Sequence, residues 1–258
     1  PHLFSSAASD VYKRQIVGAG VYYSTEGLVA MLVLFILVVP VEKLFPRHRG
    51  QKVRRPAYKL DMSYAMSSPL LNLVGLIAAV IVAVISFAWI PGLLMRPVVA
   101  QIPSEWLPIV GFLMFDFVSY WTHRFYHEIP VLWKFHAIHH STEHLDWVSG
   151  FRAHPFDGTL IAPAFAFLIA AGFSPEITGV FAIFQIVLGL LLHANVRFRF
   201  RWLHPFHGTP EMHHWHHSKE KEAIWTNYGA ASPLWDQVFG TYYMPKDKRP
   251  SVYGVDEH

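Results

Sequence analysis

Cysteine is absent from this 258-residue chain, and charged residues are scarce. The lack of cysteine excludes disulfides, thiolate zinc sites, iron–sulfur clusters and a cysteine nucleophile. Charged residues make up 15% of the sequence, whereas about 25% is usual for a soluble domain. The chain therefore lacks the charge to coat a water-soluble surface. Its net charge is only +3, and we expect no nucleic-acid partner.

Hydrophobic residues make up 53% of the chain, and many of them lie in long apolar segments. A bilayer-spanning helix needs about 20 mostly apolar residues. The segments that reach or approach that length are 27–45, 67–90, 106–121, 159–173 and 176–194. We predict an all-α, multi-pass integral membrane protein with about four to five membrane helices. The last two segments could be two spans or a shallower re-entrant pair, and each segment alone could be a buried helix of a soluble protein.

The first fifteen residues, PHLFSSAASDVYKRQ, are unlike the rest of the chain. They have neither the apolar region nor the cleavage pattern of a signal peptide, and SAASDVYKRQ resembles translated adapter sequence. We expect residues 1–15 to be a non-native leader. Residues 16–258 contain no internal repeat and no low-complexity tract, which favours a single membrane domain.

Basic residues are distributed unevenly over the loops between apolar segments. Residues 42–60 contain seven Lys or Arg residues, whereas 91–105 contain only Arg96. Short loops rich in Lys and Arg stay in the cytosol, so we predict that 42–60 lies on the cytosolic face of a bacterial inner membrane. Alternating spans then place all the histidine clusters on that same face, in a helical cap. The basic loop could also bind anionic lipid, besides acting as an ordinary topology signal.

Histidine is the residue in excess, with 17 copies, of which all but three lie between His123 and His217. HRFYH (123–127) places two histidines four residues apart, while HAIHH (136–140) and HHWHH (213–217) share the spacing HxxHH. Residues three and four apart lie on one face of a helix. A further histidine ends the fifth apolar segment. We predict as metal ligands His123, His127, His136, His139, His140, His193, His213, His216 and His217.

Nine imidazoles are too many for one ion, since a tetrahedral zinc site uses four ligands, or three and a water. Two ions with four or five imidazoles each would use all nine, and the adjacent histidines of an HxxHH box can diverge toward different ions. Imidazole suits iron, zinc, copper and nickel, so ligand type alone leaves the metal open. A histidine-rich storage tract would be polar and low in complexity, whereas apolar segments separate these boxes.

The boxes and their surroundings resemble the fatty acid hydroxylase superfamily, also called the sterol desaturase family. That family has the signature HxxxH, HxxHH and a distant [HQ]xxHH, which correspond here to HRFYH, HAIHH and HHWHH. The resemblance runs from about Asp116 to Tyr243 and includes DFVSYWTHRFYHEIPVLWKFHAIHHS, TPEMHHWHHS, NYG and LWDQVFGTYY. TPEMHHWHH and the serine after the second box are most similar to alkylglycerol-monooxygenase-like bacterial members.

This resemblance implies a membrane di-iron oxidoreductase that uses O2 to hydroxylate or desaturate a C–H bond of a lipid drawn from the bilayer. The nine histidines would bind two iron ions, for which zinc can substitute, and no catalytic residue is implied beyond the metal centre. The sequence contains no flavin, haem or cysteine-cluster motif, so a separate electron donor is implied: a ferredoxin, a cytochrome or a flavin reductase.

Two positions depart from the family pattern. His214 stands where relatives often carry Arg, and we leave it out of the ligand set. HANVR places Arg197 where lipid 2-hydroxylases of the family have a second histidine. The tenth ligand therefore stays open, and a water, Asn195 or His154 could complete the shell.

Ligating histidines usually donate their other N–H to a carboxylate or a carbonyl. Asp116 lies seven residues before His123, about two helical turns away, and a carboxylate within a span is a functional candidate by default. A helix–helix hydrogen bond would explain it equally well. We predict supporting roles near the metal for Asp116, His154, Asn195 and Asp236, with weaker candidates in Glu143, Asp146, Asp157 and Glu211.

Other classes fit the sequence less well. A soluble carboxylate-bridged di-iron site needs two Glu-x-x-His motifs, and only Glu211–His214 has that spacing. The HExxH motif of zinc proteases is absent. A metal transporter or sensor would distribute histidines along a path through the spans, and a non-catalytic lipid-binding relative would not need every box. These last two remain the alternatives.

Overall fold

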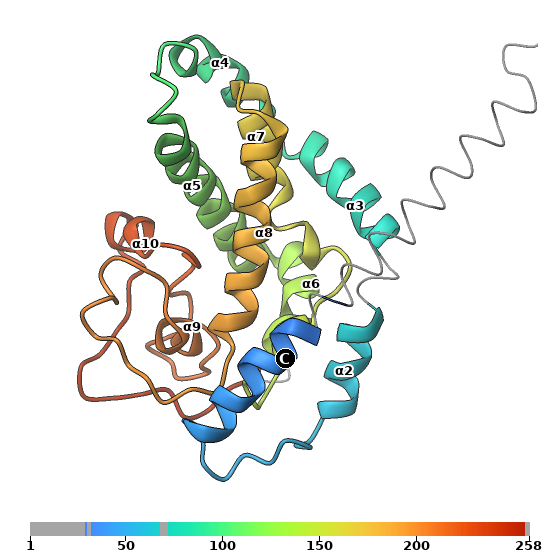
Figure 1. The fold of residues 1–258 in the computed structure, drawn as a ribbon, viewed down its shortest axis with the longest axis vertical. Helices are drawn as coiled ribbons and strands as arrows, with labels where there is room; N and C mark the ends of the chain where they lie inside the picture. The colour runs from blue at the N-terminus through green and yellow to red at the C-terminus, as the bar shows by residue number, and fades with distance from the viewer. Residues whose placement is uncertain (1–28, 30–31, 68–71, 256–258) are drawn as a thin grey trace, which may run out of the picture.

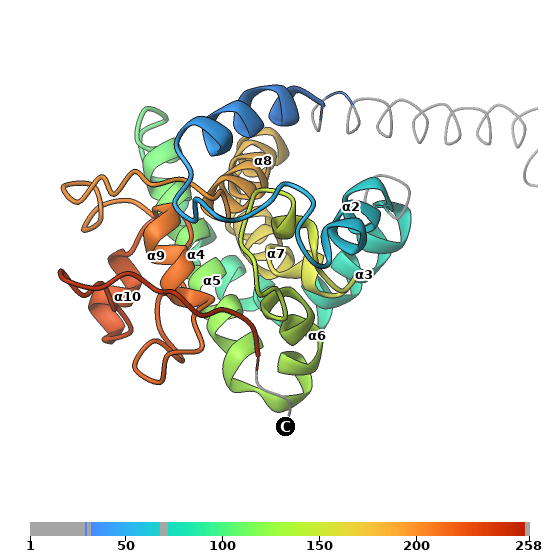
Figure 2. The same ribbon diagram turned by 90° about the horizontal axis from the view of Figure 1, so that it is seen from below.

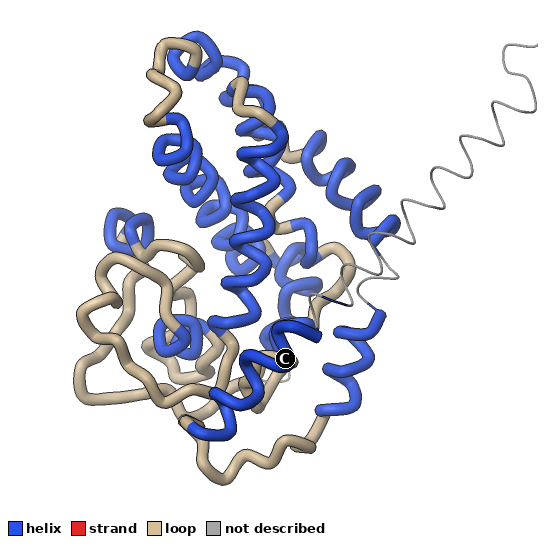
Figure 3. The backbone as a smooth tube through the Cα atoms, in the orientation of Figure 1, coloured by secondary structure: helices blue, strands red, loops and turns tan. Residues whose placement is uncertain are grey.

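The computed structural model describes residues 29, 32–67 and 72–255. The expected leader, 1–15, and the first part of the apolar segment 27–45 lie outside the described residues. Within the described part the chain is helical or irregular and forms no strand (Figure 3), apart from the isolated bridges Pro46–Val196 and Ser218–Tyr253. The predicted all-α class is confirmed for this part of the chain.

Helical backbone first covers 32–44. The named helices that follow are α2 (Tyr58–Ser67), α3 (Asn72–Ile85), α4 (Trp89–Val99), α5 (Leu107–Glu128), α6 (Pro130–His140), α7 (Ala162–Ala171), α8 (Pro175–Leu192), α9 (Pro210–His216) and α10 (Leu234–Phe239). Two 3₁₀ turns, η1 (Ser149–Phe151) and η2 (Asp157–Thr159), lie between α6 and α7. Figure 1 shows α5, α7 and α8 along the long axis, with α4 at one end and α6 and α9 toward the other. Figure 2 shows α9 and α10 on one side of α5 and α6, and α2 and α3 on the other.

The main apolar core lies between α4, α5 and α7. Phe115, Leu168 and Ala171 are buried there and pack with Val99. At Gly92 the two helices α4 and α7 approach so closely that a Cβ atom would lie 2.4 Å from the carbonyl oxygen of Phe167. Only glycine fits at that position without separating the helices.

The number of membrane helices is supported only in part. Among the described residues, α8 alone is a single helix long and apolar enough to cross a bilayer, with 18 residues and a mean hydropathy of 1.9. Residues 77–85 of α3 and helix α4 pass the same test only together, across a bend of 78°, and α7 has only 10 residues. Large apolar side chains are exposed on α3, α4 and α8, including Ile81, Leu94 and Ile183 at 50–75% exposure. These surfaces suit contact with lipid, while the count of four to five spans stays a prediction.

The segment 67–90 does not form one straight helix, as its composition had suggested. Helix α3 ends at Ile85, Phe87 has a left-handed backbone with φ +54°, and α4 begins at Trp89. Proline lacks an N–H and its ring clashes with the carbonyl four residues earlier. Pro91 therefore prevents the helix from continuing through Phe87.

Candidate metal centre

A one-residue joint between α5 and α6 brings the first two histidine boxes together. Helix α5 ends at Glu128, Pro130 begins α6, and Ile129 between them has extended backbone, with φ −95° and ψ 115°. The residue before a proline is disfavoured in the helical region, so one helix must end there and the chain turns. As a result His127 lies against His136 and His140, with ring centroids 4.7 and 4.6 Å away.

The other histidines come from two further helix ends. Helix α9 begins at Pro210, after the N-cap Thr209, whose side chain accepts a hydrogen bond from the backbone N–H of Met212. This short buried helix carries the third box, and His217 caps its C-terminus. His193 directly follows the last residue of α8. Four chain segments thus converge at the end of the molecule where α6 and α9 lie (Figure 1).

The nine predicted histidines fall into two groups, each of which could hold a metal ion. Within each group the ligating nitrogens lie within 4.8 Å of one another. The first group is His123, His127, His136, His140 and His216, and the second is His139, His193, His213 and His217. Eight of the nine are at most 9% exposed. Neighbours in each HxxHH box separate into different groups because successive residues on a helix point about 100° apart.

The Nε2 atoms in each group point toward one another at short range. In the first group, the Nε2 atom of His136 lies 3.0 Å from that of His123 and 3.1 Å from that of His140. In the second group, the Nε2 atom of His193 lies 3.1 Å from that of His217 and 3.2 Å from that of His213. The groups also touch, because the rings of His140 and His217 stack with centroids 4.2 Å apart.

Acceptors on the far side of the rings fix which nitrogen carries the proton. The Nδ1 atom of His123 lies 2.7 Å from the carbonyl oxygen of Tyr228, and that of His193 lies 2.6 Å from the carbonyl of Gly189. The corresponding carbonyl for His139 belongs to Arg152, at 3.0 Å. A carbonyl oxygen can only accept, so in these rings Nδ1–H is the donor and Nε2 presents a lone pair.

Two buried lone pairs about 3 Å apart repel each other unless a cation or a proton lies between them. A shared proton is disfavoured here, because burial lowers the pKa of His136 and of His139 to about 3. Neutral imidazole is also the form that binds metals. The tautomers of these histidines, the burial of their rings and the convergence of their Nε2 atoms therefore fit two ions bound by imidazoles.

Among the described residues, one carboxylate is hydrogen-bonded directly to the ligand set. Asp157, in η2, lies with its Oδ1 atom 2.6 Å from the Nδ1 atom of His136, and both side chains are buried. Burial raises the pKa of Asp157 to about 6, although His139, His123 and His154 oppose that shift. The pairing of a carboxylate with a ligating imidazole orients the ring and increases its basicity. From the sequence alone, Asp157 was only one of the weaker candidates for such a role.

None of the four supporting residues predicted from sequence has a hydrogen bond to a histidine of either group in the described part of the chain. Among hydrogen bonds of the described residues, none joins Asp116 to a histidine, and this carboxylate lies near Ser232 and Trp235 instead. His154 stacks on Phe135 and Phe156, and it belongs to neither histidine group.

Asn195 accepts hydrogen bonds through Oδ1 from the backbone N–H groups of Arg47 and His48, at 3.1 and 2.9 Å. It therefore anchors the basic loop beside His193.

Asp236 accepts hydrogen bonds from the backbone N–H groups of Tyr228 and Gly229, both at 2.8 Å. Asp236 thereby positions Tyr228, whose carbonyl oxygen accepts the Nδ1–H of His123. It supports a ligand through the backbone and does not contact the ligand itself.

Several residues around the centre were not found by sequence reasoning. The carbonyl oxygens of Arg152, Gly189, Thr226 and Tyr228 carry no signal in side-chain identity. His214, which we left out of the ligand set, is fully buried, and its Nδ1 atom lies 2.7 Å from Nη1 of Arg47. The guanidinium can only donate, so His214 is an acceptor there and lies outside both histidine groups.

Comparisons with known proteins identify a family and several relatives. The profile of the fatty acid hydroxylase family matches residues 108–241. An ornithine lipid hydroxylase of Rhizobium tropici is 32% identical over 241 residues, covering 90% of this chain and 68% of the relative. An alkylglycerol monooxygenase of Danio rerio is 30% identical over 155 residues, covering 59% of this chain and 33% of the relative.

A putative methylsterol monooxygenase of Dictyostelium discoideum is 29% identical over 174 residues, with 61% of each chain covered. The chain thus spans only about a third of the alkylglycerol monooxygenase that it matches. No solved structure matches the chain. The matched region contains all three histidine boxes and His193, and together with the match to the Rhizobium enzyme over most of both lengths it shows that the chain belongs to the fatty acid hydroxylase family.

Proposed function

We propose that this protein is an O2-dependent membrane oxidase that hydroxylates a C–H bond of a lipid, with two iron ions held by the nine histidines. The observation that carries the proposal is the pair of buried histidine groups, five and four rings, whose Nε2 lone pairs converge. Desaturation of the same kind of substrate is the other outcome of this chemistry. The relatives named above are lipid hydroxylases and monooxygenases, which supports oxygen insertion for this chain.

The ligands divide between the two ions as the geometry groups them. His123, His127, His136, His140 and His216 would hold one ion, and His139, His193, His213 and His217 the other. When bound, two reduced irons supply the reduction of O2, in which one oxygen atom enters a C–H bond as hydroxyl and the other leaves as water. Two of the electrons come from a separate donor, for which a ferredoxin, a cytochrome or a flavin reductase is suited. Zinc can occupy the same imidazoles.

The residues of the chain itself orient the ligands and exclude water. Asp157 and the backbone carbonyls fix the tautomers of His136, His123 and His139, so that these rings are ready to ligate without rearrangement. Trp133 packs over His127 and His140, with centroids 5.1 and 5.5 Å away, and covers the first group from outside. A dry site protects a reactive centre from side reactions.

The position of the basic loop supports a cytosolic site in a bacterial inner membrane. Arg47 reaches His214, Asn195 accepts from the backbone of Arg47 and His48, and Arg55 binds Asp146. These contacts place loop 42–60 on the same side of the molecule as the histidine groups. Because Lys- and Arg-rich loops stay in the cytosol, the centre would face the cytosol. The lipid would enter from the bilayer, beside the apolar faces of α3, α4 and α8.

Metal analysis and oxygen labelling test this function. Full-length protein, purified in detergent from iron-supplemented cells, should retain two metal ions per chain after extensive dialysis. Lipids from cells with and without the gene, grown under ¹⁸O2, should differ by a lipid carrying one ¹⁸O atom. His48, which contacts Tyr253 and belongs to neither group, supplies the control variant His48→Ala, which should keep both properties. Ready loss of metal on dialysis with no labelled lipid would instead indicate a transporter or sensor.

A further inference from the structure

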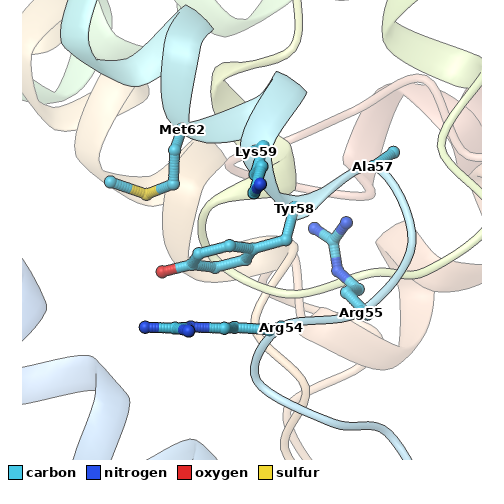
Figure 4. Close-up of a pocket in the computed structure, with 6 residues that line it drawn as sticks. All are labelled: Arg54, Arg55, Ala57, Tyr58, Lys59 and Met62. Carbon is cyan, nitrogen blue, oxygen red and sulfur yellow. The ribbon is translucent and has the colours of Figure 1, made fainter.

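A basic hollow lies at the start of α2, apart from the histidine groups. Its volume is about 620 Å³, and it is lined by Arg54, Arg55, Ala57, Tyr58, Lys59 and Met62 (Figure 4). Figure 4 shows the Arg54 guanidinium lying beneath the Tyr58 ring, with both polar ends directed to the open side. The hydroxyl and the guanidinium thus present hydrogen-bond donors at one mouth, with a thioether beside them.

Only part of the positive charge at this hollow is paired with carboxylates of the described residues. Arg55 in its wall is buried and is neutralised by Asp61 and Asp146, with N–O distances of 2.8 and 2.6 Å. Asp61 also binds Arg152, at 2.6 Å. This cluster balances two cations with two carboxylates.

Among the ion pairs of the described residues, none includes Arg54 or Lys59, and both side chains are exposed. Two positive charges and the phenolic O–H of Tyr58 are therefore available to an anion. Phosphate suits such a set of donors, since guanidinium and ammonium groups both bind it.

Exposed apolar side chains on the same stretch of chain as the lining residues indicate that the anion belongs to a lipid. Val53, Leu60 and Met66 are 52%, 49% and 53% exposed. Tyr58 and Met62 pack on the apolar cluster that includes Val38 of the first helix. A free phosphate ion would gain nothing from these surfaces, whereas a phospholipid would place its acyl chains against them.

We propose that the hollow at the start of α2 binds the phosphate of an anionic phospholipid, with Arg54, Lys59 and Tyr58 as its donors. The lipid would come from the leaflet that faces the basic loop. That leaflet carries a negative surface potential if the loop is cytosolic, as its charge predicts. This binding does not depend on the oxidase activity.

The test measures lipid binding to the purified full chain by native mass spectrometry in detergent. The probes are dioleoylphosphatidylglycerol, which is anionic, and dioleoylphosphatidylcholine, which is zwitterionic. Arg54→Ala/Lys59→Ala should weaken binding of the anionic lipid about thirtyfold, from the usual contribution of two basic residues near an anionic surface. Lys221→Ala/Lys246→Ala removes the same number of charges at two exposed lysines outside the hollow. This control should bind the anionic lipid as the wild type does.

Three results decide the proposal. Preference of the wild type for phosphatidylglycerol, lost in the hollow variant and kept in the matched control, supports it. Equal binding by all three proteins would overturn it. So would binding of inorganic phosphate as tight as that of phosphatidylglycerol, because the apolar surfaces would then contribute nothing. If the double variant does not fold, Lys59→Ala alone replaces it, because this variant changes only one exposed residue. It should weaken binding of the anionic lipid about fivefold.

Discussion

Asp157 offers the sharpest test of how the chain supports its ligands. Its Oδ1 atom lies 2.6 Å from Nδ1 of His136, and the carboxylate is 4% exposed. Asp157→Asn keeps the size and an accepting oxygen but removes the charge. Hydrogen bonds to charged groups contribute about 1.5–3 kcal/mol, and partners of ligating histidines contribute about 10–100-fold in metal affinity. Both ranges are consistent with a loss of about 2 kcal/mol in metal-binding free energy, or about thirtyfold in metal affinity.

The loss should be confined to one of the two ions. His136 belongs to the first group, whereas the second group contains His139, whose Nδ1–H is accepted by the Arg152 carbonyl. The second group is therefore an internal reference. The assay titrates the purified protein with a chelator and follows the metal content per chain. We expect Asp157→Asn to release the ion of the first group at about thirtyfold lower chelator concentration than the wild type does. The ion of the second group should leave at an unchanged concentration.

Asp116→Asn is the matched control, since it makes the same chemical change at another buried carboxylate. Asp116 lies near Ser232 and Trp235 and not against a histidine. We expect its chelator titration to follow the wild type. If both ions leave Asp157→Asn together, or if Asp116→Asn loses metal and Asp157→Asn does not, the assignment of Asp157 to the first group is refuted.

Three further predictions test the two groups, the orientation and the helix packing. His139→Ala should lose the second-group ion and His216→Ala the first-group ion, and elemental analysis should find about one metal per chain in each, with oxidation abolished. In this cysteine-free chain, a cysteine at exposed position 52 should react with an impermeant maleimide in open membranes but not in intact cells. Gly92→Ala should lower stability by about 1–3 kcal/mol in thermal unfolding because its Cβ has no room, whereas Gly179→Ala, with open space in α8, should raise it by about 0.5–1 kcal/mol.

Most of what could be predicted about the site followed from the spacing of the histidines alone. Residues at i, i+3 and i+4 share a helix face, so HAIHH had to present its rings together. The split of His139 and His140 between two groups follows from the same helical geometry. The turn at Ile129, which sets the first box against the second, is also readable, because Pro130 follows it.

Other features lay beyond the reach of sequence because they depend on tertiary contacts. A backbone carbonyl looks the same at every position, so nothing marked Arg152 or Gly189 as an acceptor. Asp116 shares a helix with His123 and was favoured for that reason, yet its neighbours come from the segment around Ser232. The bend of 78° between α3 and α4 was hidden by the apolar composition of 67–90, although Pro91 was a visible signal.

The basic loop illustrates how one composition serves two physical roles. A count of Lys and Arg predicts orientation, but the count does not separate buried residues from exposed ones. Arg55 is buried against Asp61 and Asp146, and Asp61 in turn binds Arg152, whose carbonyl accepts the Nδ1–H of His139. Removal of one partner from a buried ion pair costs about 3–5 kcal/mol, since the remaining charge is left uncompensated. Arg55 therefore stabilises the second histidine group through Asp61 and Arg152, a role that does not require the loop to contact the membrane.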